Sequence, residues 1–253
     1  MERSQTPRVV LLGASNVALG LLDATDAARA KLAAPVEVLA ACGHGRSYGS
    51  SAKFLTRTLC SIDGCGLWAA LERLPRARTC AVVTDYGNDI AFGFGPERSA
   101  GWLERVLDRL AAHGAEVVLT GLPLAALERI GPIQFRFWKS VFFPTRRFTR
   151  ERVLAEVREL DARVGEIARR RGLAKLDPRL AWYGLDPIHI ARGQRPQAWG
   201  AYVGAWSGAQ ARAVSRAALR GRLWHERVRV LGMEVGRAQP CATLSDGTTF
   251  SLY

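Results

Sequence analysis

The sequence predicts one α/β domain built around a parallel β-sheet. Short, nearly continuous apolar runs alternate with longer segments of helical periodicity, as strands and their connecting helices do in a parallel sheet. The 253 residues are enough for one sizeable domain of this class, and no repeat, low-complexity segment or linker divides them. A hydrophobic fraction of 48% and a charged fraction of 23% are typical of an ordinary globular protein.

Five apolar runs are the predicted strands. Each is apolar at successive positions rather than at alternate ones, as expected for strands that helices cover on both faces. We expect these strands at residues 8–12, 36–41, 79–84, 116–120 and 173–176.

Between the strands, apolar residues recur at helical spacing. One such stripe lies within 102–110, and a second lies within 153–167 on an arginine-rich segment that Gly172 is expected to end. A third stripe, rich in aromatic residues, lies within 199–206. We expect the third stripe to pack on the sheet rather than to hold a ligand.

The pattern changes after about residue 226. The last segment contains short strand-like runs, the second of them folded at Asp246-Gly247, a pair typical of a type I′ hairpin turn. We therefore divide the chain into a main α/β domain, 1–225, and a C-terminal β-hairpin appendage of the same domain, 226–253. We expect no chemistry from the appendage.

The segment 132–150 mixes aromatic side chains with cations. Three interpretations compete for it: packing over an exposed face of the sheet, a flap beside an apolar substrate, and an element that lies on a membrane surface. We place packing first, because aromatic clusters usually belong to a core. The flap comes second, because long excursions in such folds often border the site.

Charge and composition limit the expected partners and location. The net charge of +13 is carried almost wholly by arginines scattered along the chain, so we expect no nucleic-acid partner. No apolar run is long enough to span a bilayer, and the first residues lack a signal-peptide core, so we expect a cytoplasmic protein. The five cysteines form no CxxC pair, which favours reduced thiols over disulfides or a metal site.

Residues 9–20, VVLLGASNVALG, first suggest a dinucleotide-binding turn. Such a turn needs glycines where the backbone approaches the pyrophosphate and where the helix packs on the strand. Those positions fall on Asn16 and Leu19, and Gly20 comes one residue late. The turn therefore predicts no cofactor. It leaves Ser15 as either a helix N-cap or a nucleophile at the start of a helix.

A nucleophilic serine needs a base, and the base needs a group that orients it. His189 follows the last predicted strand, and Asp186 precedes it by three residues. At that spacing in a turn, the carboxylate can reach Nδ1 of the imidazole and leave Nε2 free. The alternative is that Asp186 only caps the turn. His44, in a glycine-rich loop, stays a second candidate for the base, whereas His225 lies among charged residues and is expected to be solvated.

Two further loops could donate hydrogen bonds to an oxyanion. Gly87-Asn88-Asp89 follows the third strand, and three glycines within 43–49 follow the second. In an open parallel sheet, ligands bind beyond the carboxyl ends of the strands. The serine turn, the glycine loop, the Asn88 loop and the His189 loop therefore fall on one rim, where they can converge.

These four segments, in this order, resemble the SGNH (GDSL-type) hydrolase family over about residues 8–192. The resemblance implies a three-layer α/β/α sandwich with a five-stranded parallel, flavodoxin-like sheet. It also implies Ser15 as nucleophile, His189 as base and Asp186 as the orienting partner of His189. The chain departs from the family directly before the serine, where Ala14 replaces the usual aspartate and gives GASN in place of GDSL.

The resemblance further implies an oxyanion hole. Its donors would be the Ser15 N–H, the Asn88 side chain and a glycine N–H. Among the glycines we prefer Gly45, because the GRS that it begins resembles the small-polar turn of the family, and Gly49 is the alternative.

The sequence thus predicts a serine hydrolase of carboxylesterase or deacetylase type. It would cleave a small-molecule ester through an acyl-enzyme, with no cofactor and no metal. Two alternatives stay open: acyl transfer to an acceptor hydroxyl by the same triad, and a non-catalytic module that binds an anionic partner in the same cleft. The motifs specify neither the acyl part nor the alcohol part of the substrate.

Overall fold

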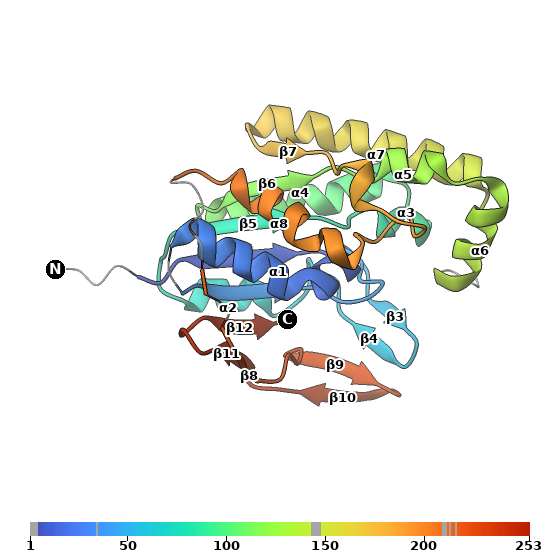
Figure 1. Cartoon of the computed structure of the whole chain (residues 1–253). Helices are drawn as coiled ribbons and strands as arrows, with labels where there is room; N and C mark the ends of the chain where they lie inside the picture. Colours follow the sequence, from blue (N-terminus) through green and yellow to red (C-terminus); the bar gives the residue numbers. More distant parts are fainter. Residues whose placement is uncertain (1–4, 34, 143–147, 209–211, 213, 216) are drawn as a thin grey trace.

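A large central β-sheet lies between two layers of helices (Figure 1). The computed structural model describes residues 5–33, 35–142, 148–208, 212, 214–215 and 217–253. All five predicted strands are present, and neighbouring strands among them run parallel. In sheet order they are β7 (Ala174–Leu176), β6 (Glu116–Thr120), β5 (Thr79–Val83), β1 (Arg8–Leu12) and β2 (Glu37–Ala41). This order confirms the predicted flavodoxin-like α/β/α sandwich.

Strand β1 shows why these runs are apolar at every position. Val9 and Leu11 belong to the core on one face of the sheet, and Val10 and Leu12 belong to the core on the other. All four side chains are fully buried. A strand covered on both faces has no solvent side, so no polar residue alternates with the apolar ones.

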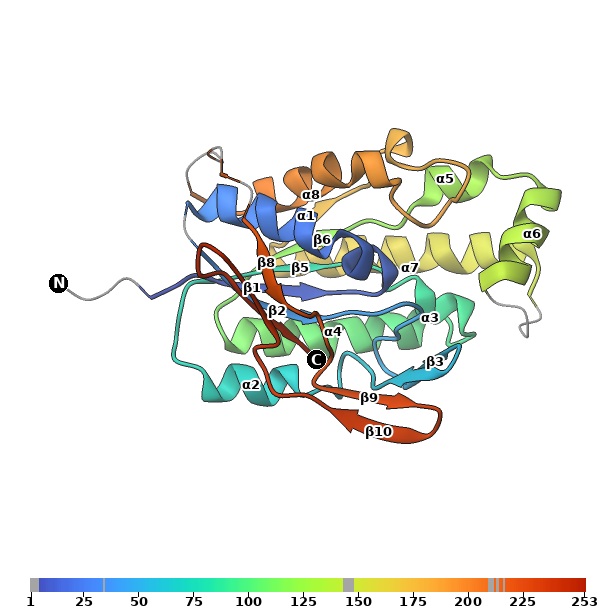
Figure 2. The ribbon, with the colours of Figure 1, turned by 60° about the horizontal axis from the view of Figure 1, so that its bottom comes forward.

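The two helix layers lie on opposite faces of the sheet (Figure 2). Helices α1 (Ser15–Leu32) and α8 (Arg195–Gly204) cover one face, and their packing explains Gly20. A Cβ at Gly20 would lie 2.0 Å from Nε1 of Trp199, so a side chain there would displace the indole. The other face carries α2 (Leu67–Arg73), α4 (Pro96–Ala112) and α7 (Arg150–Arg171).

Helix α7 follows the predicted pattern. The Thr149 hydroxyl accepts a hydrogen bond from the Arg152 N–H at its start, and Gly172, with φ +64°, ends it. Shorter helices follow the carboxyl ends of the strands and build the rim of the sheet. They are α3 (Asn88–Ala91), α5 (Leu124–Arg129), α6 (Pro132–Phe142) and the 3₁₀ helices η1 (Leu180–Trp182) and η2 (Arg192–Gln194).

The C-terminal segment extends the main sheet. Strand β12 (Thr249–Leu252) pairs in parallel with β2, and β11 (Ala242–Leu244) and β8 (Leu219–Gly221) follow it antiparallel. The β11–β12 hairpin is folded at Asp246-Gly247 as expected. However, only Gly247 of this pair has a positive φ, whereas a type I′ turn needs both, so the predicted turn type is wrong.

A second, antiparallel sheet joins two distant parts of the chain. It consists of β10 (Met233–Gly236), β9 (Arg227–Val230), β4 (Arg57–Leu59) and β3 (Ala52–Phe54), in that order. In Figure 1 this sheet lies below the main sheet, on the side where β12 lies. The C-terminal strands therefore contribute to both sheets.

Helix α6 lies at the edge of the molecule, beyond the carboxyl ends of the strands (Figure 1). Ile133, Phe137 and Val141 on its outer side are exposed. Other α6 side chains line a cavity that reaches Ser15, which favours the flap interpretation of 132–150 over packing on the sheet. Residues 143–147 of that segment lie outside the described residues. Among the residues described, no helix combines the length and the apolar character needed to cross a membrane.

Candidate active site

Ser15 is the first residue of α1, directly after the turn that leaves β1. The N-cap of the helix is Ala14, whose side chain makes no capping hydrogen bond, so the N-cap interpretation of Ser15 is wrong. The turn is tightly packed: a Cβ on Gly13 would lie 2.6 Å from Cγ2 of Val17 and 2.8 Å from Cγ2 of Thr84. Ser15 itself is 8% exposed. Because Ser15 comes directly after the turn that follows β1, its hydroxyl lies at the carboxyl-end rim of the sheet.

The Ser15 hydroxyl meets His189. Ser15 Oγ lies 2.8 Å from Nε2 of His189, and Nδ1 of the same ring lies 2.6 Å from Oδ2 of Asp186. An ionised carboxylate can only accept, so Nδ1 carries the proton and Nε2 is left to accept the serine proton. The structure thus brings the three predicted triad residues into one hydrogen-bonded line, and the candidate base beside Ser15 is His189.

Asp186 makes both contacts that the sequence left as alternatives. Its Oδ2 holds the imidazole, and its Oδ1 accepts hydrogen bonds from the N–H groups of Ile188 (2.9 Å) and His189 (3.2 Å). Burial acts to raise the pKa of Asp186. The hydrogen bonds and the charge of His189, together with the two backbone N–H groups, outweigh burial and hold that pKa below its usual value. The carboxylate is therefore ionised near neutral pH.

Two of the three candidate oxyanion donors, Asn88 and Gly45, lie on adjacent loops. Asn88 is the first residue of α3, and its Nδ2 lies 3.4 Å from the carbonyl oxygen of Arg46 in the glycine loop. Gly45 turns that loop with φ +65°. Within the described part of the chain, neither the Ser15 N–H nor the Gly45 N–H donates to a protein acceptor. Both groups are available to a ligand oxygen.

The other two glycines of the loop have different surroundings. The Gly43 N–H donates to the carbonyl of the residue before Ser15 (3.3 Å), and the Gly49 N–H donates to Oγ of Ser47 (3.3 Å). A Cβ on Gly49 would overlap the Trp102 indole, which shows that Gly49 serves the packing of the loop on α4. These contacts favour Gly45 over Gly49 as a candidate donor.

Arg46 and His225, to which the sequence assigned no role in the site, hold the glycine loop through hydrogen bonds. The buried Arg46 guanidinium donates to the carbonyl oxygens of Cys42 (3.2 Å), Cys60 (3.1 Å) and Tyr253. His225 donates from Nε2 to the Cys42 carbonyl (2.7 Å). The expected solvation of His225 is therefore wrong: burial lowers its pKa and keeps the ring neutral. The C-terminal segment supports this loop through His225 and Tyr253.

Asp85 holds the serine turn. Its Oδ2 accepts from the N–H groups of Ala14 (2.8 Å) and Asn16 (3.0 Å), the two residues that flank Ser15. Asp85 adopts φ +61°, a left-handed conformation that aspartate tolerates better than most side chains. Because the carboxylate takes the N–H groups on both sides, the Ser15 N–H between them is left for another acceptor.

Asn16 connects this turn to the loop that carries His189. Its Nδ2 donates to Oδ1 of Asp85 (2.8 Å) and to the carbonyl of Ile188 (2.9 Å), and its Oδ1 accepts from the N–H of Ile190 (2.9 Å). Ile188 and Ile190 flank His189 on either side. One aspartate and one asparagine therefore link the neighbours of the nucleophile candidate to the neighbours of the base candidate. We call Asp85 and Asn16 the serine–histidine clamp.

A second buried carboxylate, Asp89, joins the two oxyanion loops. It is fully buried, and its Oδ2 accepts from the Tyr48 N–H (3.2 Å). Burial raises the pKa of Asp89 to about 7, against the smaller opposing effect of hydrogen bonds from Ser47 and Tyr48. The pKa of Asp89 is thus raised and that of Asp186 lowered, because burial dominates at Asp89 and hydrogen bonds dominate at Asp186.

The site shows no arrangement typical of a bound metal. Among the described residues, no group of three or more His, Cys, Asp and Glu side chains is placed to hold a metal ion.

Comparisons with known proteins yield only structural likenesses. No family model matches the sequence, and no curated relative matches it. A psychrotrophic esterase, EstA from Pseudoalteromonas sp., is 13% identical and aligns over 76% of this chain and 92% of its own, with a TM-score of 0.44. TesA is 18% identical over 78% and 95% of the two chains, with a TM-score of 0.46. An extracellular lipase from Streptomyces rimosus is 13% identical over 79% and 98%, with a TM-score of 0.43.

Proposed function

We propose that this protein is a serine ester hydrolase of SGNH type that works through an acyl-enzyme. The observation that carries the proposal is the line from Ser15 Oγ to His189 Nε2 (2.8 Å) and from His189 Nδ1 to Asp186 Oδ2 (2.6 Å). This line lies at the carboxyl ends of parallel strands, and among the described residues the N–H groups of Ser15 and Gly45 donate to no protein acceptor. A serine, a base and an orienting carboxylate at hydrogen-bond distance are the parts that acyl transfer to serine needs.

In the first step, Ser15 Oγ attacks the carbonyl carbon of the ester, and its proton passes to His189 Nε2. Asp186 holds the ring in the productive tautomer and stabilises the imidazolium that forms, which its lowered pKa allows because the carboxylate is already ionised. The negative charge on the former carbonyl oxygen is stabilised by donors from Ser15 N–H, Gly45 N–H and Asn88 Nδ2.

In the second half, the bond between the carbonyl carbon and the alcohol oxygen breaks, and the alcohol leaves with the proton from His189. Water then attacks the acyl-enzyme while His189 takes its proton. The bond from the acyl carbon to Ser15 Oγ breaks, and the serine recovers its proton from His189 as the acid leaves. His189 Nε2 thus accepts each proton and gives it up again in both halves of the reaction.

A fluorophosphonate probe tests this proposal, because it reacts only with an activated serine. We expect the wild-type protein to be labelled at Ser15 and the Ser15→Ala variant to be unlabelled. Hydrolysis of p-nitrophenyl acetate should fall by at least about 10⁴-fold in Ser15→Ala. Ser51→Ala, which changes an exposed serine elsewhere, is the matched control and should behave as wild type. An unlabelled wild-type protein, or continued labelling of Ser15→Ala, would overturn the assignment.

A further inference from the structure

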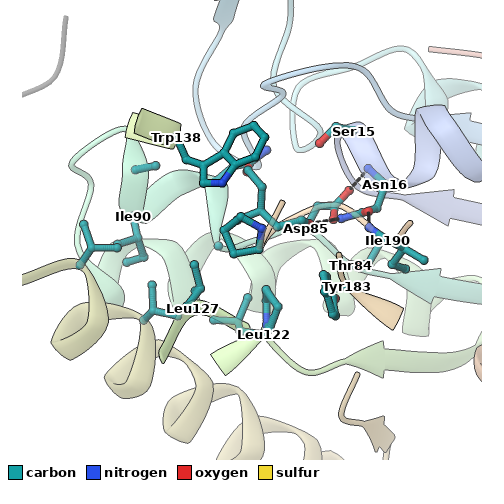
Figure 3. A pocket seen from close by; sticks show the side chains of 18 of the residues that line it. Ser15, Asn16, Thr84, Asp85, Ile90, Leu122, Leu127, Trp138, Tyr183 and Ile190 are labelled. Carbon is teal, nitrogen blue, oxygen red and sulfur yellow. Dashed lines mark hydrogen bonds between the residues drawn. The ribbon is translucent and has the colours of Figure 1, made fainter. Parts of the chain in front are cut away.

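An apolar cavity of about 120 Å³ opens beside Ser15 and Asn88. Figure 3 shows it from close by, with Ser15 and Asn16 at one end and Trp138 on the side opposite Leu122 and Leu127. The wall is made by α3, α5, α7, α6 and the His189 loop. Its apolar side chains include Ile90, Leu122, Leu127, Ile130 and Val157. Because the candidate nucleophile and the candidate oxyanion donor both border it, a group bonded to the carbonyl carbon would enter it directly.

Four polar side chains that line the cavity, those of Asn16, Thr84, Asp85 and Thr120, are engaged with one another. The hydroxyl of Thr120 donates to the hydroxyl of Thr84 (2.7 Å), and Asp85 accepts from the serine turn and from Asn16. A polar substrate group placed here would lose its hydrogen bonds to water without replacing them, which is costly. A hydrocarbon chain has nothing to lose in this way and gains by leaving water.

Helix α6 forms the outer wall of the cavity. Phe135 and Trp138 line it, and α6 is tied to the body of the protein by two side chains. Gln134 Nε2 (2.8 Å) and Trp138 Nε1 (3.0 Å) both donate to the carbonyl oxygen of Leu185. Leu185 directly precedes Asp186 in the chain. The wall that limits the depth of the cavity is therefore anchored to the loop that carries the base.

We propose that this cavity receives the acyl chain of the ester, and that a chain of about four to six carbons fills it. This inference rests on the proposed hydrolysis at Ser15. A dry apolar cavity of about 150 Å³ in another protein accommodates benzene, which sets the scale of roughly six carbons for a cavity of this size. Acetyl leaves most of the space empty, and longer chains exceed its volume.

The chemistry places the two halves of the ester on different sides of Ser15. In the acyl-enzyme, the carbonyl carbon is bonded to Ser15 Oγ, and its chain extends past Asn88 into the cavity. Asn88 lines the cavity and His189, which protonates the leaving alcohol, is not among its lining residues, so we place the acyl chain in the cavity and the alcohol on the His189 side. Each CH₂ group that the cavity buries should raise kcat/KM by about fourfold until the space is filled.

A series of p-nitrophenyl esters from acetate to decanoate tests this directly. For the wild-type protein we expect kcat/KM to rise from acetate, to peak at butanoate or hexanoate, and to fall for octanoate and decanoate. Ala91→Leu adds carbon to the wall and should shift the optimum toward acetate. Leu127→Ala removes carbon and should shift the optimum to longer chains. Ala125→Leu, on the exposed side of α5, is the matched control and should leave the profile unchanged.

The outcomes separate this inference from the proposed function. A profile that is flat or falls from acetate to hexanoate in a wild-type protein that still reacts with the fluorophosphonate probe overturns the acyl cavity but leaves the serine hydrolase intact. Loss of both labelling and hydrolysis overturns both. The chain-length profile of the wild-type protein tests the acyl cavity even where a variant fails to fold. Where both variants fold, optima that stay at the wild-type chain length also overturn the acyl cavity.

Discussion

Two regions that meet at Ser15 are built by different physical means, although Asn16 and Asp85 of the first also line the Ser15 end of the second. On one side, Asp85 and Asn16, the serine–histidine clamp, make five directional hydrogen bonds of 2.8–3.0 Å to each other and to backbone groups. On the other side, apolar side chains surround a cavity, and two donors on one carbonyl tie its outer wall, α6, to the His189 loop. The first side has polar partners at fixed geometry, and the second is mainly apolar surface.

This difference matches what each side has to do. Proton transfer between Ser15 and His189 needs atoms held within a fraction of an ångström, which directional bonds provide. An acyl chain needs only apolar surface of the right extent, because the hydrophobic effect is non-directional. Changes on the polar side should therefore affect all esters alike, whereas changes in the cavity should depend on chain length.

The largest effect beyond loss of the triad is expected at Asn88. Asn88→Ala removes an amide donor from the candidate oxyanion hole, and we expect kcat to fall by about 10²–10³-fold for acetate and hexanoate esters alike. Steady-state kinetics on both esters measures this. Asn88→Asp, similar in shape but without a donor, should be at least as impaired. A loss confined to long-chain esters would show that Asn88 acts only as part of the cavity wall and not as an oxyanion donor.

A smaller loss is expected when the clamp is opened. Asn16→Ala frees both neighbours of His189, and misplacement of a reacting group by about 1 Å costs roughly 10²-fold. We expect kcat to fall by up to this factor with little change in KM, equally for short and long acyl chains. The ring N–H proton between His189 and Asp186 should also shift or broaden in the NMR spectrum.

Thr25→Val is the matched control for Asn16→Ala. Thr25 is a buried polar side chain on the same helix, and its hydroxyl donates to the Leu21 carbonyl (2.8 Å), far along α1 from Ser15. This variant should lose stability without a change in kcat. If Asn16→Ala behaves like Thr25→Val, the clamp serves folding only and the contrast between the two sides of Ser15 fails.

Much of the site could be predicted because its signals are local. The DxxH spacing places a carboxylate within reach of its own histidine, and the position of Ser15 directly after an apolar run places it at the carboxyl end of a strand. A parallel sheet then brings such strand ends together. The five strands could be predicted equally well, because each is a short apolar run bounded by turn residues. These inferences needed no knowledge of which distant residues meet.

The clamp could not be predicted, because its partners are far apart in sequence. Asn16 bonds to groups 172 and 174 residues away, and Asp85 lies 69 residues beyond Asn16. The one available signal was Ala14, which lacks the carboxylate that the resembled family has beside its serine. Asp85 supplies a carboxylate at that turn from another strand end. The parallel pairing of β12 with β2 was hidden for the same reason, since nothing in residues 249–252 specifies their neighbour.

The last expected effect is on stability rather than on catalysis, and it concerns Asp89 and Asp186. In the unfolded chain the pKa of Asp89 is near 3.8, and in the folded protein it is about 7. Between these values the folded state holds a proton that the unfolded state has lost. The free energy of unfolding should therefore fall as pH rises from 4 to 7, by up to about 1.4 kcal/mol per pH unit from this group, and should level off above 7.

Asp89→Asn removes this titration while keeping an oxygen for the Tyr48 N–H. Urea unfolding of both proteins at pH 5, 6, 7 and 8 should show the wild type losing stability relative to Asp89→Asn up to pH 7, with a constant difference above it. Asp186 carries the opposite sign: its lowered pKa contributes stability that is present above pH 4 and lost as pH falls below it. If the stability of wild type and of Asp89→Asn changes in parallel from pH 5 to pH 8, Asp89 is ionised in the folded protein throughout this range. The expected rise in its pKa is then wrong.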